Sequence, residues 1–283
     1  MRINVIRSFA KINIGLNVTG TRKDGFHELD MVMVPLQLHD TMIFTDVPRS
    51  HDNITIDDFS IQLSRNNLIE KAVQIFNKKT GIDKHFSIYV HKITPIKGGL
   101  GGGSSNAAST LLLLNKRNKT NLSNKELEEL AIQLGSDVPF FIENKPKRCT
   151  GVGEKMVDVD IKNDYFVLLV KPKDGCSTKD VFTKCDDLSL KTYDIDKVVE
   201  ALNKGDDGML EQYLGNSLLE PAITFVPEIE TIINLLKSKG LKIVSMTGSG
   251  SCVFALSTNK KLLKSLIPEL EDKYEVILTK ILK

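Results

Sequence analysis

The chain has 283 residues, of which 41% are hydrophobic and 26% are charged, and its formal net charge is +2. This composition is that of an ordinary globular protein of one large or two modest domains, and it excludes a strong overall attraction to nucleic acid or anionic membranes. No apolar run approaches the roughly 20 residues needed to span a bilayer, and residues 1–18 lack the apolar block of a signal peptide. The four cysteines form no CxxC pair, so we expect neither a disulfide framework nor a zinc site, and a reducing cytoplasm as the location.

In chain order, alternating polar and apolar residues first predict strands over 2–9, 11–18, 31–38 and 42–47. A helix over 67–81 follows, with Leu68, Ala72, Ile75 and Phe76 on one face and Gly81 as its stop. The next elements are a strand over 85–93 and helices over 105–117, 122–135 and 136–143. Ser123 and Glu126 have the spacing of a capping box at the start of the helix over 122–135.

The second part of the chain repeats this mixture. It predicts strands over 165–172 and 274–282, two more strands within 241–258, and helices over 194–205, 207–218, 227–240 and 259–270. We therefore predict an α+β protein of two lobes, divided into residues 1–158 and 159–283.

A glycine-rich loop, "PIKGGLGGGSSNAAS" from Pro95 to Ser109, leads directly into the helix over 105–117. The first turn of a helix has free backbone N–H groups and a partial positive charge, and glycines allow the backbone to curl around an anion. We expect Ser104 and Ser105 to cap this helix and to offer hydroxyls to phosphate or Mg²⁺. The alternative is a flexible hinge, but the density of glycines before a helix favours phosphate binding.

The details of this loop exclude the commoner phosphate loops. A Walker A loop ends in Gly-Lys-Ser/Thr, whereas this loop ends in Gly103-Ser104-Ser105. A dinucleotide-binding fingerprint would need glycine at position 104, and a protein-kinase glycine loop lies between two strands instead of opening a helix.

The loop resembles the second motif of the GHMP kinases, the family of galactokinase, homoserine kinase, mevalonate kinase and phosphomevalonate kinase. Segments 10–40, "GSDVPFFI" at 135–142 and "MTGSGSCVFA" at 246–255 are similar to further motifs of this family in the same order. The resemblance implies a two-lobed α+β GHMP kinase fold with the active site in the cleft between the lobes. It also implies ATP-dependent phosphorylation, with Mg²⁺, of the 2-hydroxyl of 4-diphosphocytidyl-2-C-methyl-D-erythritol in non-mevalonate isoprenoid precursor biosynthesis.

The sequence departs from the family pattern at two positions. Lys97 stands in the loop where small residues are usual, and this could alter the local shape of the loop. Phe26 stands where the family commonly has tyrosine, so a phenolic hydroxyl is missing.

Two residues are the catalytic candidates. Lys11 lies on a predicted strand, and its pattern alone favours a solvated lysine at a sheet edge; the resemblance makes it the catalytic lysine. Asp137 lies at a predicted helix start, where capping by Ser136 and Asp137 is the alternative; the resemblance makes it the catalytic aspartate. The resemblance also assigns ATP binding to the loop, that is to Pro95, Ile96, Lys97, Gly98, Gly99, Leu100, Gly101, Gly102, Gly103, Ser104, Ser105 and Asn106.

The resemblance further implies a site for the cytidine substrate. Phe26 and Phe182 would sandwich the cytosine, His27 would hydrogen-bond its edge, and Asn13 and Thr178 would hold the substrate near Lys11. The alternatives are a hairpin tip with an incidental aromatic at Phe26 and ordinary core packing of Phe182. Gly248, within "TGSGS" at 247–251, would lie under the substrate, with a tight hairpin turn as the alternative, and "TGVGE" at 150–154 predicts only a turn.

Two rival functions stay open from the sequence. Another GHMP kinase, acting on homoserine or mevalonate, would leave Phe26, His27 and Phe182 unexplained, and a catalytically silent nucleotide-binding regulator would have no need of Lys11 and Asp137. The expected partner is a small-molecule substrate linked to cytidine diphosphate, with no nucleic acid and no membrane, on a monomer or homodimer. The sequence assigns no protein ligands to Mg²⁺.

Overall fold

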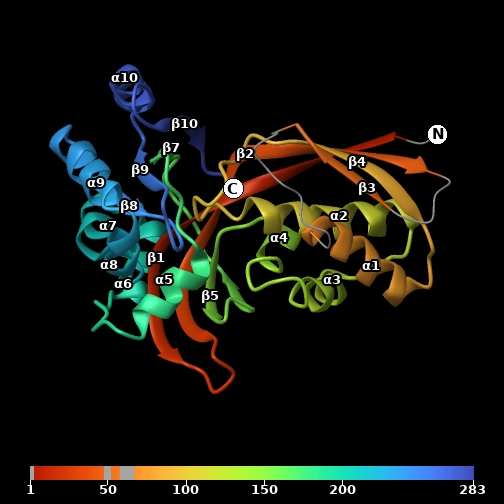
Figure 1. The fold of residues 1–283 in the computed structure, drawn as a ribbon. Coiled ribbons are helices and arrows are strands. Elements are labelled where there is room, and N and C mark those ends of the chain that lie inside the picture. The colour runs from red at the N-terminus through yellow and green to blue at the C-terminus, as the bar shows by residue number, and fades with distance from the viewer. Residues whose placement is uncertain (1–2, 48–51, 58–66) are drawn as a thin grey trace. The chain divides into compact units, whose positions relative to one another are not determined.

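The computed structural model describes residues 3–47, 52–57 and 67–283 (Figure 1). These residues form two compact units, and the chain passes between them several times. Unit 1 comprises Met1–Ala10, Leu38–Thr94 and Gly101–Asn144, and unit 2 comprises Lys11–Gln37, Pro95–Leu100 and Lys145–Lys283. The segments of the two units alternate along the chain, and the predicted division after residue 158 lies inside unit 2. The division into domains of residues 1–158 and 159–283 stays a prediction.

Two long strands belong to both units. β1 (Ile3–Thr21) and β2 (His27–Val47) are each continuous, whereas the sequence analysis predicted two shorter strands in each place. The start of the first predicted strand, residue 2, lies outside the described residues. In the middle of β1, the polar residues Lys11 and Asn13 are almost fully buried.

Unit 1 contains an antiparallel pairing of the C-terminal part of β2 with β4 (His85–His91), in the register Thr41–His91 to Val47–His85. A short strand, β3 (Asn53–Ile56), adds to β4 in parallel. The helices α1 (Leu68–Thr80), α2 (Gly102–Asn118), α3 (Asn124–Ala131) and α4 (Phe140–Glu143) lie on one side of these strands (Figure 1).

Local signals at the ends of the unit 1 helices were read correctly. Gly81 ends α1, as predicted, in the left-handed conformation, and Asn67, which was predicted to lie within the helix, is its N-cap residue. Ser123 and Glu126 form the predicted capping box of α3. The buried face of α1 is shifted from the predicted one, because Ile69, Ala72, Val73 and Phe76 are its buried residues.

Unit 2 contains two groups of strands. The N-terminal part of β2 pairs with β5 (Lys147–Gly151), which forms a hairpin with β6 (Lys155–Asp158), so "TGVGE" is indeed a turn but one between strands that the sequence analysis missed. The second group is an antiparallel sheet in the order β10 (Glu275–Lys280), β7 (Phe166–Lys171), β9 (Val253–Ser257) and β8 (Ile243–Met246). The four cysteines are free and buried, as expected.

The helices of unit 2 are α5 (Thr178–Cys185), α6 (Ile195–Lys204), α7 (Asp207–Tyr213), α8 (Leu219–Phe225), α9 (Glu228–Ser238) and α10 (Lys260–Glu271). The predicted helices and strands of this part are present, but α7 ends at Tyr213 instead of residue 218, and α5 and α8 are additions. None of the helices in the described part of the chain is both long and apolar enough to cross a membrane.

Candidate active site

The glycine loop opens α2 without a side-chain cap. Gly101 is the N-cap residue in the left-handed conformation, and no side chain accepts a hydrogen bond from the helix start. Ser104 and Ser105 lie inside the first turn, so the prediction that they cap the helix is wrong, and the hydroxyl of Ser105 accepts a hydrogen bond from Ser8 at 2.8 Å. Uncapped amide groups at a helix N-terminus are a ready binding site for an anion.

In unit 2, the first part of the loop packs directly on the backbone of residues 246–255, the segment that resembles the third GHMP motif. A Cβ on Gly99 (φ +73°) would lie 2.2 Å from the carbonyl oxygen of Thr247, and one on Gly248 (φ +56°) would lie 3.1 Å from that of Gly99. Glycine is therefore required at position 99 both for the conformation and for the close approach. The segment 247–251 is more than a tight hairpin turn, because it holds the loop in place.

Lys97, the departure from the family pattern, takes the left-handed conformation itself, with φ of 54°. Its carbonyl oxygen accepts a hydrogen bond from the backbone N–H of Ser251 at 3.3 Å, and its Cβ lies 2.5 Å from where a Cβ on Gly175 would be. Glycine would adopt this conformation at less cost, and Gly175 makes room for the lysine side chain.

A buried polar network in unit 2 connects Lys11 to Thr247 and to the backbone of the glycine loop. The ammonium group of Lys11 donates to Oδ1 of Asn13 at 2.6 Å, and the backbone N–H of Asn13 donates to the hydroxyl of Thr247 at 3.0 Å. The backbone N–H of Lys11 donates to the carbonyl oxygen of Leu100, a buried residue of the loop. Because Lys11 and Asn13 are 3% and 2% exposed, the interpretation of Lys11 as a solvated edge lysine is excluded.

The third motif is held by further side chains of unit 2. The amide group of Asn216 donates to the carbonyl oxygens of Met246 and Gly248, each at 2.9 Å, so Asn216 clamps the turn from outside. The hydroxyl of Thr178, at the start of α5, lies 3.0 Å from that of Ser249. Thr178 and Gly248 are thus brought to one turn, while Asn216 was missed because it has no local signal in the sequence.

Two of the residues predicted to bind the cytosine, His27 and Phe182, lie against each other. The ring of His27 lies against that of Phe182, with centroids 5.1 Å apart and an angle of 35° between the planes, and His27 Nε2 lies 3.1 Å from a carboxylate oxygen of Asp186. Phe26 is 57% exposed at the hairpin tip. Phe182 is half-buried, so the core-packing alternative does not describe it, since Val181 and Cys185 are the buried residues of α5.

Asp137 lies in unit 1, in the turn that precedes α4. The helix begins at Phe140, three residues later than the carboxylate, and its N-cap residue, Pro139, provides no side-chain cap. Asp137 is half-buried. The helix-capping alternative therefore does not account for an aspartate at this position.

A charged cluster of unit 1, missed by the sequence analysis, lies at the start of α2. The ammonium group of Lys92 lies 2.7 Å from where a Cβ on Gly102 would be. The fully buried Asp40 accepts a hydrogen bond from Lys92 at 2.5 Å and another from the side-chain amide of Asn106 at 3.1 Å. The sequence signal for this cluster was Lys92, which stands shortly before the glycine loop. Its partner Asp40 is 52 residues away in the sequence, so the pair could not be predicted from a local pattern.

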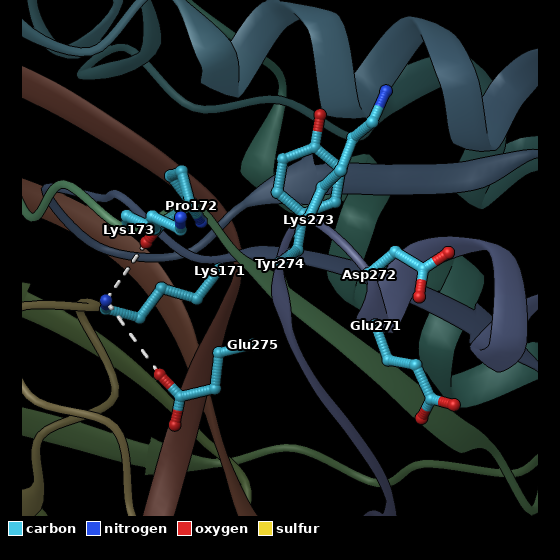
Figure 2. A pocket seen from close by; sticks show the side chains of 8 residues that line it. All are labelled: Lys171, Pro172, Lys173, Glu271, Asp272, Lys273, Tyr274 and Glu275. Carbon is cyan, nitrogen blue, oxygen red and sulfur yellow. Dashed lines mark hydrogen bonds and ion pairs between the residues drawn. The ribbon is translucent and has the colours of Figure 1, made fainter.

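A separate cavity of about 330 Å³ lies on unit 2 (Figure 2). Charges of both signs surround it, and its lining residues are Lys171, Pro172, Lys173, Glu271, Asp272, Lys273, Tyr274 and Glu275. Lys171 is buried; its ammonium group donates to the carbonyl oxygen of Pro172 at 3.0 Å and pairs with Glu275 at 3.9 Å. None of the predicted site residues lines this cavity, although the Lys171 side chain lies 3.4 Å from where a Cβ on Gly98 would be.

Metal binding by the protein alone has no support in the described part of the chain. There, no group of three or more His, Cys, Asp and Glu side chains is placed to hold a metal ion.

Comparison with known proteins identifies two matching family models. The model described as "GHMP kinases N terminal domain" matches residues 67–145, and "GHMP kinases C terminal" matches residues 198–276. Two curated relatives are named 4-diphosphocytidyl-2-C-methyl-D-erythritol kinase. The one from Fusobacterium nucleatum is 37% identical and covers 99% of both chains, and the one from Clostridium beijerinckii is 34% identical and covers 95% of this chain and 96% of the relative.

Solved structures agree with these matches. A crystal structure of 4-(cytidine 5'-diphospho)-2C-methyl-D-erythritol kinase superposes with a TM-score of 0.81 at 28% identity, over 98% of this chain and 99% of that one. Homoserine kinase from Cytophaga hutchinsonii superposes with a TM-score of 0.75 at 16% identity, over 98% of this chain and 95% of that one, and shows the fold alone.

Proposed function

The chain belongs to the GHMP kinases, and from this premise we propose that it transfers the γ-phosphoryl group of ATP to the 2-hydroxyl of 4-diphosphocytidyl-2-C-methyl-D-erythritol. The relatives that cover nearly the whole chain are named for this substrate, and homoserine kinase shares the fold at only 16% identity. The observation that carries the proposal is the buried network from Lys11 through Asn13 and Thr247 to the glycine loop.

Phosphoryl transfer needs an anion cradle, positive charge near the transferring group, and a group that orients the acceptor hydroxyl. The glycine loop and the uncapped start of α2 supply the cradle. Lys11 supplies the positive charge, and Asn13 fixes the direction of its ammonium group through a 2.6 Å hydrogen bond. A cation held in advance costs no reorganisation when charge develops on the phosphoryl oxygens.

Asp137 is proposed to orient and deprotonate the acceptor hydroxyl. Its carboxylate is half-buried and lies three residues before the first residue of α4, so helix capping does not account for it. In a loose transition state little proton transfer has occurred, and orientation of the hydroxyl contributes more than the strength of the base.

The cytidine part of the substrate is proposed to bind at the hairpin tip and α5. His27 and Phe182 form one aromatic surface there, with Asp186 fixing the His27 ring. The exposed Phe26 is proposed to supply the second face when the base is bound. Stacking on an aromatic ring is worth about 1–3 kcal/mol per base.

Mg²⁺ is proposed to enter with ATP. Mg²⁺ keeps several waters and takes substrate phosphate oxygens together with one or two protein groups, which agrees with the lack of a three-residue metal cluster in the described residues. When bound, it neutralises phosphate charge. The free, buried cysteines support a location in the reducing cytoplasm.

The test is ADP release with three acceptors, namely the cytidine diphosphate-linked methylerythritol, mevalonate and homoserine. We expect turnover with the first alone, and loss of it in Lys11→Met. Turnover with mevalonate or homoserine would replace the proposed acceptor. ATP binding without turnover of any acceptor would identify a catalytically silent member of the family.

A further inference from the structure

We propose that Asp40 is a positioning residue for the nucleotide, acting through Lys92 at the start of α2. This inference rests on the proposed function, since it concerns the ATP that the kinase would use. All the residues that carry it belong to unit 1.

Asp40 is a fully buried carboxylate with four hydrogen-bond donors around it. One oxygen accepts from the backbone N–H groups of Ile93 and Thr94, at 2.9 and 2.8 Å. The other accepts from the ammonium group of Lys92 and the side-chain amide of Asn106. Burying a charge is costly unless it is paired and hydrogen-bonded, and Asp40 meets both conditions.

The network ties two segments together across the start of α2. Residues 92–94 precede the glycine loop, and Asn106 belongs to its last part, inside α2. Asn106 also donates to the hydroxyl of Ser8, which in turn donates to Ser105. Asp40 therefore fixes both ends of the loop, and the side chain of Asn106, which the sequence analysis assigned to ATP, is engaged in this network.

The position of Lys92 is unusual for a structural ion pair. Its ammonium group lies at the N-terminal end of a 17-residue helix, where the helix dipole already places partial positive charge. A cation there is unfavourable for the helix alone and favourable when an anion binds. Asp40 offsets this repulsion until the anion is present, and it holds the ammonium group beside Gly102.

A second observation at the same place points to a ligand. The hydroxyl of Thr94 is buried and has no hydrogen-bond partner among the described residues. The Cγ2 atom of Thr94 lies 3.2 Å from where a Cβ on Gly102 would be. The threonine with this unsatisfied hydroxyl thus lies beside Gly102 at the start of α2, next to the Lys92 ammonium group, as expected for a nucleotide site without its nucleotide.

The experiment measures binding of ATP to the full-length protein by calorimetry, with KM for ATP and for the acceptor and the melting temperature alongside. The variants are Asp40→Asn, Lys92→Met and the double variant. Asp52→Asn is the matched control, because Asp52 also accepts a backbone N–H in unit 1, that of Phe86, at 2.7 Å. We expect Asp40→Asn and Lys92→Met each to weaken ATP binding about 10- to 100-fold, the range for one charge-assisted hydrogen bond.

The double variant should bind ATP no more weakly than Lys92→Met, because Asp40 acts through Lys92. KM for the acceptor should stay near wild type in every variant, and Asp52→Asn should leave ATP binding unchanged. Wild-type ATP affinity in Asp40→Asn, or losses that multiply in the double variant, would overturn the inference. If Asp40→Asn does not fold, unchanged ATP affinity in Lys92→Met overturns it equally.

These outcomes separate this inference from the proposed function. A wild-type protein that binds ATP but does not phosphorylate the cytidine substrate would refute the proposed acceptor. The role of Asp40 would still be tested, because ATP binding is measured without turnover. An active wild-type kinase with an unaffected Asp40→Asn variant would refute only the role of Asp40.

Discussion

Replacing Gly99 by alanine tests whether the glycine loop and the third motif are packed as one structure. The methyl group would lie 2.2 Å from the carbonyl oxygen of Thr247 and 3.1 Å from its carbonyl carbon, so one of the two backbones must move. The hydroxyl of Thr247 accepts the backbone hydrogen bond of Asn13, which holds Lys11. A shift at position 99 is therefore transmitted to the ammonium group of Lys11.

The expected loss in the free energy of unfolding of Gly99→Ala has a conformational part and a steric part, and a control variant separates them. Gly81 has almost the same backbone conformation as Gly99, with φ of 69° against 73°, but a Cβ there would meet no atom within 4 Å. Gly81→Ala should lower the free energy of unfolding by about 1–2 kcal/mol, the cost of the left-handed conformation for a residue with a Cβ. Gly99→Ala carries the same cost and the steric conflict as well, so we expect at least twice the loss.

The assay is thermal unfolding of both variants together with kcat for the kinase reaction. About 1 kcal/mol corresponds to roughly 2–4 °C in Tm for a chain of this size class. Gly81→Ala should keep its kcat, whereas a displacement near 1 Å at Thr247 should reduce kcat of Gly99→Ala about 100-fold. Equal Tm losses in the two variants, with kcat unchanged in both, would refute the packing argument.

Three further predictions concern single sites. Asp137→Asn should lower kcat about 10²- to 10⁴-fold, as for loss of a general base, with little change in KM; wild-type kcat would contradict its role. Phe182→Ala should weaken binding of the cytidine substrate by about 1–3 kcal/mol and leave KM for ATP unchanged; a large loss of Tm with intact substrate affinity would make Phe182 a packing residue instead. Burial raises the pKa of the Cys176 and Cys185 thiols to about 11, so at pH 8 only about one thiol in a thousand is ionised, and iodoacetamide should modify them only after unfolding; mass spectrometry of the native protein decides this.

Much of the fold follows from local signals in the sequence. The caps of α1 and α3 are formed by Asn67 and by Ser123 with Glu126, and such motifs involve residues at most three apart. The hairpin of β5 and β6 was missed for the opposite reason. Its first residue, Lys147, reads as an exposed charge but is buried, because Asp158 on the neighbouring strand pairs with it at 2.5 Å. A charge neutralised across two strands leaves no local pattern.

In the candidate site, too, short sequence motifs could be predicted, whereas contacts between distant positions could not. The loop, Lys11 and the third motif are recognisable as short runs of sequence, but the link that joins Lys11 to Thr247 through Asn13 spans 236 positions of the chain. His27 and Phe26 were predicted to serve one cytosine together. The ring of His27, the first residue of β2, lies against that of Phe182, whereas Phe26 precedes the strand and is 57% exposed, and this pairing across the chain has no local signal.

Gly102 shows why a glycine in the loop must be tested at the right position. From the sequence, a branched side chain at Gly102 would block the phosphate. In the structure a Cβ at Gly102 would first meet the ammonium group of Lys92 at 2.7 Å and Cγ2 of Thr94 at 3.2 Å, so weaker ATP binding in Gly102→Val would have two explanations.

Gly103 provides the cleaner variant, because a Cβ there would meet only Cδ1 of Leu68, at 3.9 Å. Since Gly103 lies in the first turn of α2, alanine should raise the free energy of unfolding by about 0.4–1 kcal/mol by restricting the unfolded chain. If the loop binds phosphate through closely approached amide groups, Gly103→Ala should nevertheless raise KM for ATP about tenfold. A variant that is more stable and keeps its KM for ATP would show that glycine at this position serves no phosphate, and would remove the first turn of α2 from the nucleotide site.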